Sequence, residues 1–206
     1  MRWTTAFVFV LATAGIAAAD DKADLKKTLD ARLAAAKAGD VAKYIETSPK
    51  KFAEYFQTVS EHTEATAAWH AALRAKFPAD AEKFFSGGGT LKSKMLEIKS
   101  FALVGDPKFS GDSVTFDLRV GRAFANGQKS ENVEPFVGVR EDGAWKVVDA
   151  KTDKNAKGYL STVPGIKRQI PAIAQAARDV ESGKYTDFRT ALETSVAAIR
   201  KAEQGK

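Results

Sequence analysis

The 206-residue chain is 28% charged, carries a formal net charge of +6 and contains no cysteine. The lack of cysteine excludes thiol nucleophiles, thiolate metal ligands and disulfides. Basic and acidic residues are interleaved along the chain rather than concentrated in one basic segment, so we expect no nucleic-acid partner.

Residues 1–19 have the pattern of a secretory signal peptide. Arg2 supplies a positive charge, an uncharged and mostly apolar stretch follows over residues 6–19, and small residues precede Asp20. A membrane-spanning helix needs about 20 consecutive apolar residues, and this stretch is shorter. We therefore predict cleavage before Asp20, export to the periplasm or the medium, and no membrane span.

The first half of the mature chain is predicted to be helical. Apolar residues recur every third or fourth position from Leu25 to Ala36, and Gly39 ends this helix. A short helix over residues 41–45 follows. The longest apolar stripe then runs over residues 52–77 and ends at Pro78.

The periodicity changes to that of strands over residues 91–150. Strands are predicted at residues 96–104, 114–120, 133–139 and 145–148. Gly105-Asp106-Pro107 is expected to end the first of them, and Asn126-Gly127 and Asp142-Gly143 are typical of hairpin turns. The pattern predicts four antiparallel strands in a meander.

A polar, Lys-rich link over residues 151–158 precedes two apolar stripes separated by Gly183, which indicate an antiparallel helical pair. The predicted fold class is therefore α+β, with N-terminal helices packed on a curved four-stranded antiparallel meander and a C-terminal helical pair. The predicted division is a signal peptide (1–19), a cone-shaped α+β domain (20–150) and a C-terminal helical extension (151–206).

Two segments resemble the nuclear-transport-factor-two-like superfamily, which includes ketosteroid isomerases and polyketide cyclases. Residues 35–44 resemble the exit of its first helix, and residues 141–148 resemble its closing hairpin. The resemblance covers residues 24–150. It implies a sheet curled into a cone, closed by helices around a pocket, in an exported member of unknown function.

The resemblance suggests a pocket with aromatic walls. Its expected lining residues are Phe52, Phe56, Trp69, Phe116 and Phe136. Our first hypothesis is a non-catalytic exported domain that binds a small apolar ligand or a protein partner in this pocket. A homodimer whose pocket is filled by side chains is a further alternative.

The second hypothesis is a small lyase or isomerase that uses acid–base chemistry in the same pocket. His70 is a candidate base because histidine titrates near neutrality, and Asp117 is a candidate because relatives place a carboxylate on the sheet. The competing interpretations are a histidine at the core edge and an aspartate on a solvated sheet face. His62 and His70 lie two helical turns apart, about 12 Å, so we predict no metal site and no cofactor.

Overall fold

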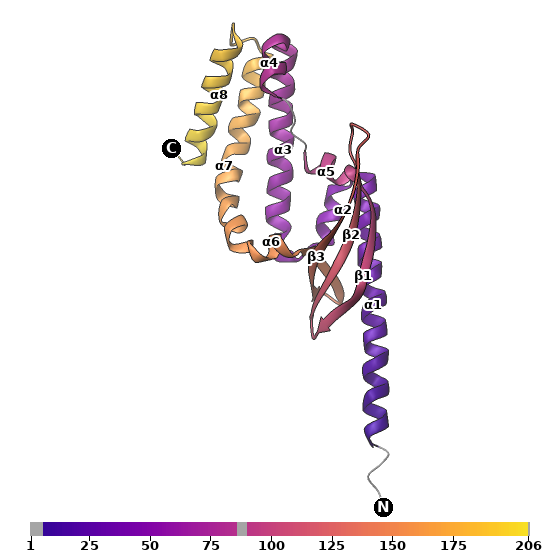
Figure 1. The fold of residues 1–206 in the computed structure, drawn as a ribbon. Helices are drawn as coiled ribbons and strands as arrows, with labels where there is room; N and C mark the ends of the chain where they lie inside the picture. The colour runs from indigo at the N-terminus through magenta and orange to yellow at the C-terminus, as the bar shows by residue number, and fades with distance from the viewer. Residues whose placement is uncertain (1–5, 86–89, 206) are drawn as a thin grey trace, which may run out of the picture. The chain divides into compact units, whose positions relative to one another are not determined.

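A computed structural model describes residues 6–85 and 90–205, with side chains described from residue 20 onward (Figure 1). Within these ranges the chain combines helices with one antiparallel sheet, which confirms the predicted α+β class. The predicted signal peptide lies partly outside the described residues. Its residues from Ala6 onward continue the first helix, and its cleavage stays a prediction.

The chain divides into two compact units, each formed by two segments. The sheet unit contains the residues up to Lys50 and residues 96–154, and the helical unit contains residues 51–95 and 155–206. This division differs from the predicted one, which grouped residues 51–95 with the sheet. Those residues associate with the C-terminal helices because the two segments share one apolar core.

The sheet unit consists of two N-terminal helices, four strands and a short helix. Their bounds are α1 (Ala6–Ala38), α2 (Val41–Glu46), β1 (Ile98–Ser110), β2 (Ser113–Ala123), β3 (Lys129–Glu141), β4 (Ala144–Asp149) and α6 (Ala150–Lys154). The strands pair in the order β1-β2-β3-β4 as an open antiparallel meander, as predicted. Helix α1 contacts both edge strands, β1 and β4.

The turns follow the local sequence closely. Asp142 and Gly143 both have positive φ, 52° and 75°, as a two-residue hairpin turn requires. Strand β1 is longer than predicted, because the chain pairs again at Lys108 after a register shift that follows Val104. Gly105-Asp106-Pro107 therefore forms an irregularity within β1 and does not end it.

Alternation along β2 defines two faces of the sheet. We call the face with the even-numbered residues of β2 the inner face, because Val114, Phe116, Leu118 and Val120 are all buried there. The odd-numbered residues lie on the outer face, where Asp117 and Arg119 are exposed. The buried stripe of α1 consists of Leu25, Leu29, Arg32 and Ala36, so it includes one charged residue.

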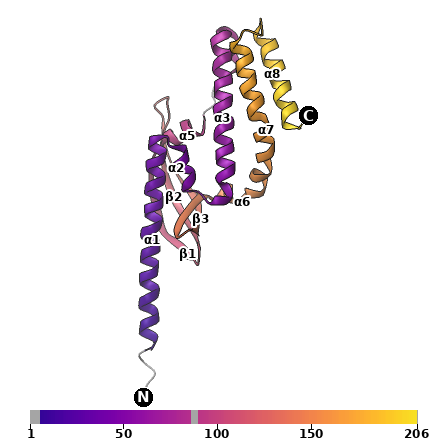
Figure 2. The ribbon, with the colours of Figure 1, turned by 180° about the vertical axis from the view of Figure 1, so that it is seen from behind.

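The helical unit is built mainly from three long helices and one short one. These are α3 (Lys50–Lys76), α4 (Pro78–Phe84), α7 (Ala156–Glu181) and α8 (Phe188–Glu203). Helices α3, α7 and α8 lie side by side, and α7 and α8 form the predicted antiparallel pair (Figures 1 and 2). The predicted polar link is wrong, since α6 and the start of α7 make residues 151–158 mostly helical.

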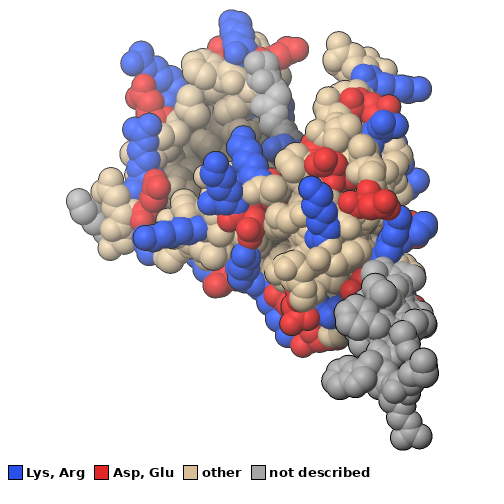
Figure 3. Space-filling model, turned by 60° about the horizontal axis from the view of Figure 1, so that its bottom comes forward, with Lys and Arg blue, Asp and Glu red and all other residues tan. Residues whose placement is uncertain are grey.

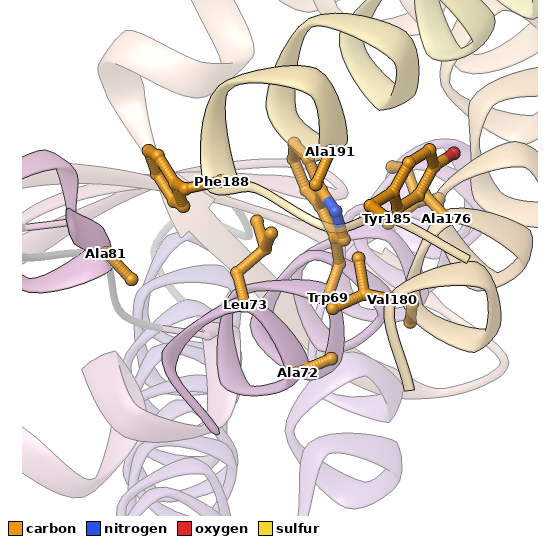
Figure 4. Packing of buried hydrophobic residues seen from close by; sticks show 11 residues of the cluster. Trp69, Ala72, Leu73, Ala81, Ala176, Val180, Tyr185, Phe188 and Ala191 are labelled. Atoms are coloured by element: carbon orange, nitrogen blue, oxygen red, sulfur yellow. The ribbon is translucent and has the colours of Figure 1, made fainter. Parts of the chain in front are cut away.

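One helix joins the two units, and sequence periodicity missed it: α5 (Leu91–Glu97) occupies the start of the first predicted strand. The core of the helical unit is apolar and involves α3, α4, α7 and α8 (Figure 4). Its buried members are Trp69, Ala72, Leu73, Ala81, Ile173, Ala176, Ala177, Val180, Tyr185, Phe188 and Ala191.

Candidate functional site

The predicted site residues fall into two groups. The four on α3, which are Phe52, Phe56, Trp69 and His70, belong to the helical unit, while Phe116, Asp117 and Phe136 belong to the sheet unit. The predicted site residues are therefore divided between the two units.

Phe116 and Phe136 pack against each other in the core of the sheet unit. They are register partners on β2 and β3, both are buried, and their rings are stacked with centroids 5.8 Å apart. Asp117 points to the opposite face. These three residues line one hollow of about 280 Å³, together with Lys108 and other residues of the outer face.

Trp69 is part of the apolar core of the helical unit and is 6% exposed. Phe52 is fully buried, and its ring centroid lies 6.0 Å from that of Phe56. These positions fit the regular apolar stripe that the sequence shows on α3.

His70 lies at the edge of the helical core. Its ring stacks on Phe85 with centroids 4.0 Å apart. Partial burial lowers the pKa of His70, and the nearby Arg74 charge lowers it further. Both effects favour the neutral form of the imidazole, and the group that stacks on it is the aromatic ring of Phe85.

His62 lies near Gln169, with its Nε2 atom 2.9 Å from the amide oxygen. This contact joins α3 to α7 within the helical unit. Among the residues that the structure describes, no group of three or more His, Asp or Glu side chains is arranged to hold a metal ion.

The sequence interpretation missed an ion pair on the inner face of the sheet. Arg122 donates two hydrogen bonds to Glu134, at 2.6 and 3.1 Å, and both side chains are partly buried. The hydrogen bonds to Glu134 raise the pKa of Arg122. Arg122 continues the even-numbered apolar series of β2, so strict alternation could have revealed it as a charged group on the buried face.

A second buried arginine lies on α1. Arg32 is only 3% exposed, and its Nη1 donates to Thr47 Oγ1 at 2.8 Å and to Ser48 Oγ at 3.0 Å. Its guanidinium also lies 3.8 Å from the ring centroid of Tyr44. Its Nε has no hydrogen-bond partner among the described residues. All of these contacts of Arg32 are with neutral groups.

A cavity of about 340 Å³ lies beside β4, and we call it the edge cavity. It is formed by residues of α1, of α2 and its C-terminal cap, and of the β3–β4 turn and β4. Its lining residues are Asp24, Lys27, Thr28, Ala31, Lys43, Glu46, Thr47, Gly143, Ala144, Trp145 and Lys146.

A hollow of about 540 Å³ lies on the helical unit, and we call it the Phe84 hollow. Phe84 is 65% exposed although its ring centroid is 5.2 Å from that of the buried Phe188. The hollow is lined by Asp80, Phe84, Asp187, Phe188, Arg189, Leu192 and Glu193.

Charge is dispersed over the face of the molecule shown in Figure 3, where basic and acidic side chains alternate. No helix in the described part of the chain has both the length and the apolar character needed to cross a bilayer. Comparison with known proteins identifies no matching family model, curated protein or solved structure.

Proposed function

We propose that the protein is an exported, non-catalytic domain that binds a protein partner through the Phe84 hollow. The observation that carries this proposal is the 65% exposure of Phe84 next to apolar neighbours in a hollow of about 540 Å³. Water-exposed aromatic side chains beside a depression are typical of protein interaction sites, because burying them on binding is favourable.

The rim of the hollow indicates the chemistry of the partner. It carries Asp80, Asp187 and Glu193 but only one cation, Arg189. Arg189 is paired with Glu193 at 2.8 Å and is also attracted to Asp187, so one cation faces three carboxylates on the rim. The partner segment is therefore expected to present an apolar side chain flanked by lysine or arginine.

The remaining hypotheses fit the geometry less well. Phe116 and Phe136 occupy the inner face by stacking on each other, which favours a protein partner over a small apolar ligand. For the lyase or isomerase alternative, His70 contacts Phe85 and Asp117 faces outward on the sheet. Export rests on the signal-peptide pattern, and membership of the nuclear-transport-factor-two-like superfamily rests on the sequence resemblance.

A peptide-binding experiment tests the proposed surface. The probe is a short fluorescein-labelled peptide with a Leu-Phe pair flanked by lysines, and its binding is followed by fluorescence anisotropy. We expect saturable binding that Phe84→Ala weakens about tenfold, the loss typical of an interfacial aromatic anchor. The same peptide with glutamates in place of lysines is expected to bind more weakly.

Val133→Ala is the matched control, because Val133 is also an exposed apolar residue, at 52%, but lies on the sheet unit. Equal binding by wild type, Phe84→Ala and Val133→Ala would exclude the Phe84 hollow as the site. Export is tested separately by N-terminal sequencing of the extracytoplasmic protein, which is expected to begin at Asp20.

A further inference from the structure

The edge cavity has walls that are held by hydrogen bonds to the edge strand. Thr28 Oγ1 donates to the carbonyl of Trp145 at 3.0 Å, and the amide of Val147 donates to the carbonyl of Thr47 at 2.8 Å. The Lys146 ammonium donates to the carbonyl of Glu46 at 2.6 Å. Because these bonds tie α1 and α2 to β4, the cavity is a preformed feature of the sheet unit.

Cations outnumber anions in the lining of this cavity. It contains Lys27, Lys43 and Lys146 against Asp24 and Glu46. Lys43 is paired with Asp40 at 3.2 Å, and Asp24 lies 3.7 Å from Nη2 of Arg140, which also pairs with Asp21. Lys27 makes no hydrogen bond or ion pair with the described residues, so its ammonium is available to a ligand.

Arg32 adds a buried positive charge directly behind the wall. It donates to Thr47 Oγ1, and Thr47 lines the cavity. It also follows Thr28 by one helical turn on α1, and Thr28 lines the cavity as well. A buried guanidinium with neutral partners and an unpartnered Nε is stabilised by a nearby anion.

Trp145 also lines the cavity but is only 1% exposed, whereas Ala31 and Ala144 are exposed and give the cavity apolar surface. We propose that the edge cavity binds a small organic anion, with its carboxylate or phosphate near Lys27 and its apolar body on these residues. This site is in the sheet unit and is independent of the Phe84 hollow, so either proposal can fail without the other.

Isothermal titration calorimetry of the purified protein at about pH 7 tests this site. The probes are benzoate and phenyl phosphate as anions and benzamide as a neutral analogue of benzoate. We expect both anions to bind saturably with one site, and benzamide to bind at least tenfold more weakly than benzoate, because charge-assisted hydrogen bonds are the stronger ones.

Lys27→Ala is expected to weaken benzoate binding about tenfold. Lys26→Ala is the matched control, because it makes the same charge change on the neighbouring residue, which pairs with Asp30 and does not line the cavity. Absence of saturable anion binding by the folded wild type would overturn the proposal. Equal losses in the two variants, or equal binding of benzamide and benzoate, would also overturn it.

Discussion

The buried polar side chains of the two units differ in charge. The sheet unit buries Arg32 and places the Arg122–Glu134 ion pair on its inner face. In the described part of the helical unit, the fully buried polar side chains are hydroxyl groups, those of Thr58, Ser60 and Ser195. The difference follows from the backbone. Long helices satisfy most of their own carbonyls. At the end of the six-residue α2, Thr47 Oγ1 donates to the carbonyl of Tyr44 at 2.7 Å, and Arg32 adds a longer hydrogen bond of 3.4 Å to the same carbonyl.

The largest expected effects on stability come from substitutions in the two cores, and they test whether the two units unfold independently. Trp145→Ala removes a side chain that is 1% exposed in the sheet unit, and Leu73→Ala removes one that is fully buried in the helical unit. We expect losses in the free energy of unfolding of about 3–5 kcal/mol and about 2–5 kcal/mol, respectively. Urea denaturation measures both losses.

Native-state hydrogen exchange then locates these losses. Trp145→Ala is expected to lower protection mainly in β1–β4, and Leu73→Ala mainly in α3, α7 and α8. Equal loss of protection in both units for each variant would show that the units unfold together, contrary to this comparison.

The next largest effect on stability is expected on the inner face of the sheet and not on its outer face. Glu134→Gln removes the carboxylate that binds Arg122 on the inner face, and we expect a loss of about 1–3 kcal/mol. Asp117→Asn on the exposed outer face is the control, with an expected change within about 0.5 kcal/mol. Similar losses for both variants by chemical denaturation would remove the distinction between the faces.

Helix α8 of the helical unit has a side-chain cap at its N-terminus. Asp187 accepts a hydrogen bond from the amide of Thr190 at 2.9 Å, and this bond lowers the pKa of Asp187. Asp187→Ala is expected to lower the melting temperature, while Asp187→Asn keeps most of the stability because asparagine also caps helices. The charged cap contributes at pH above the unfolded pKa and is lost as the pH falls through the lower folded value. Identical losses for the two variants would exclude capping as the cause.

The smallest effect concerns His70, whose pKa is lowered from 6.5 by burial. The unfolded chain binds a proton at this histidine more readily than the folded chain, so stability is full above about pH 6.5 and falls as the pH is lowered through the folded value. His70→Gln is expected to reduce the decrease in urea midpoint between about pH 7 and pH 5. An unchanged decrease would assign this pH dependence to other groups.

The order of helices and strands was largely predictable because it depends on local periodicity. The alternation of β2, the Asp142-Gly143 turn and the helical pair around Gly183 all follow from neighbouring residues. Helix α5 was missed because seven residues are too few to show a clear period, and the end of β1 was misplaced because pairing with β2 resumes beyond Pro107.

The candidate sites were much less predictable. The edge cavity combines side chains from residues 24–47 and 143–146, and the Phe84 hollow combines residues 80–84 and 187–193. Nothing in either local pattern indicates that these segments meet. The exposure of Phe84 could not be predicted from the sequence either, because a phenylalanine in a helix is normally expected to be buried.

Three features could be predicted from the sequence alone: most of the order of helices and strands, the α+β class and the absence of thiol chemistry. They depend on composition and on contacts between near neighbours in the chain. The tertiary structure decided that α3 belongs with α7 and α8, and which partners the buried arginines find. The register of β2 on β3 places Glu134 opposite Leu118, on the same face of the sheet as Arg122. The packing of α1 on α2 brings Arg32 to the hydroxyl groups of Thr47 and Ser48. Such pairings depend on long-range geometry, which neither periodicity nor composition encodes.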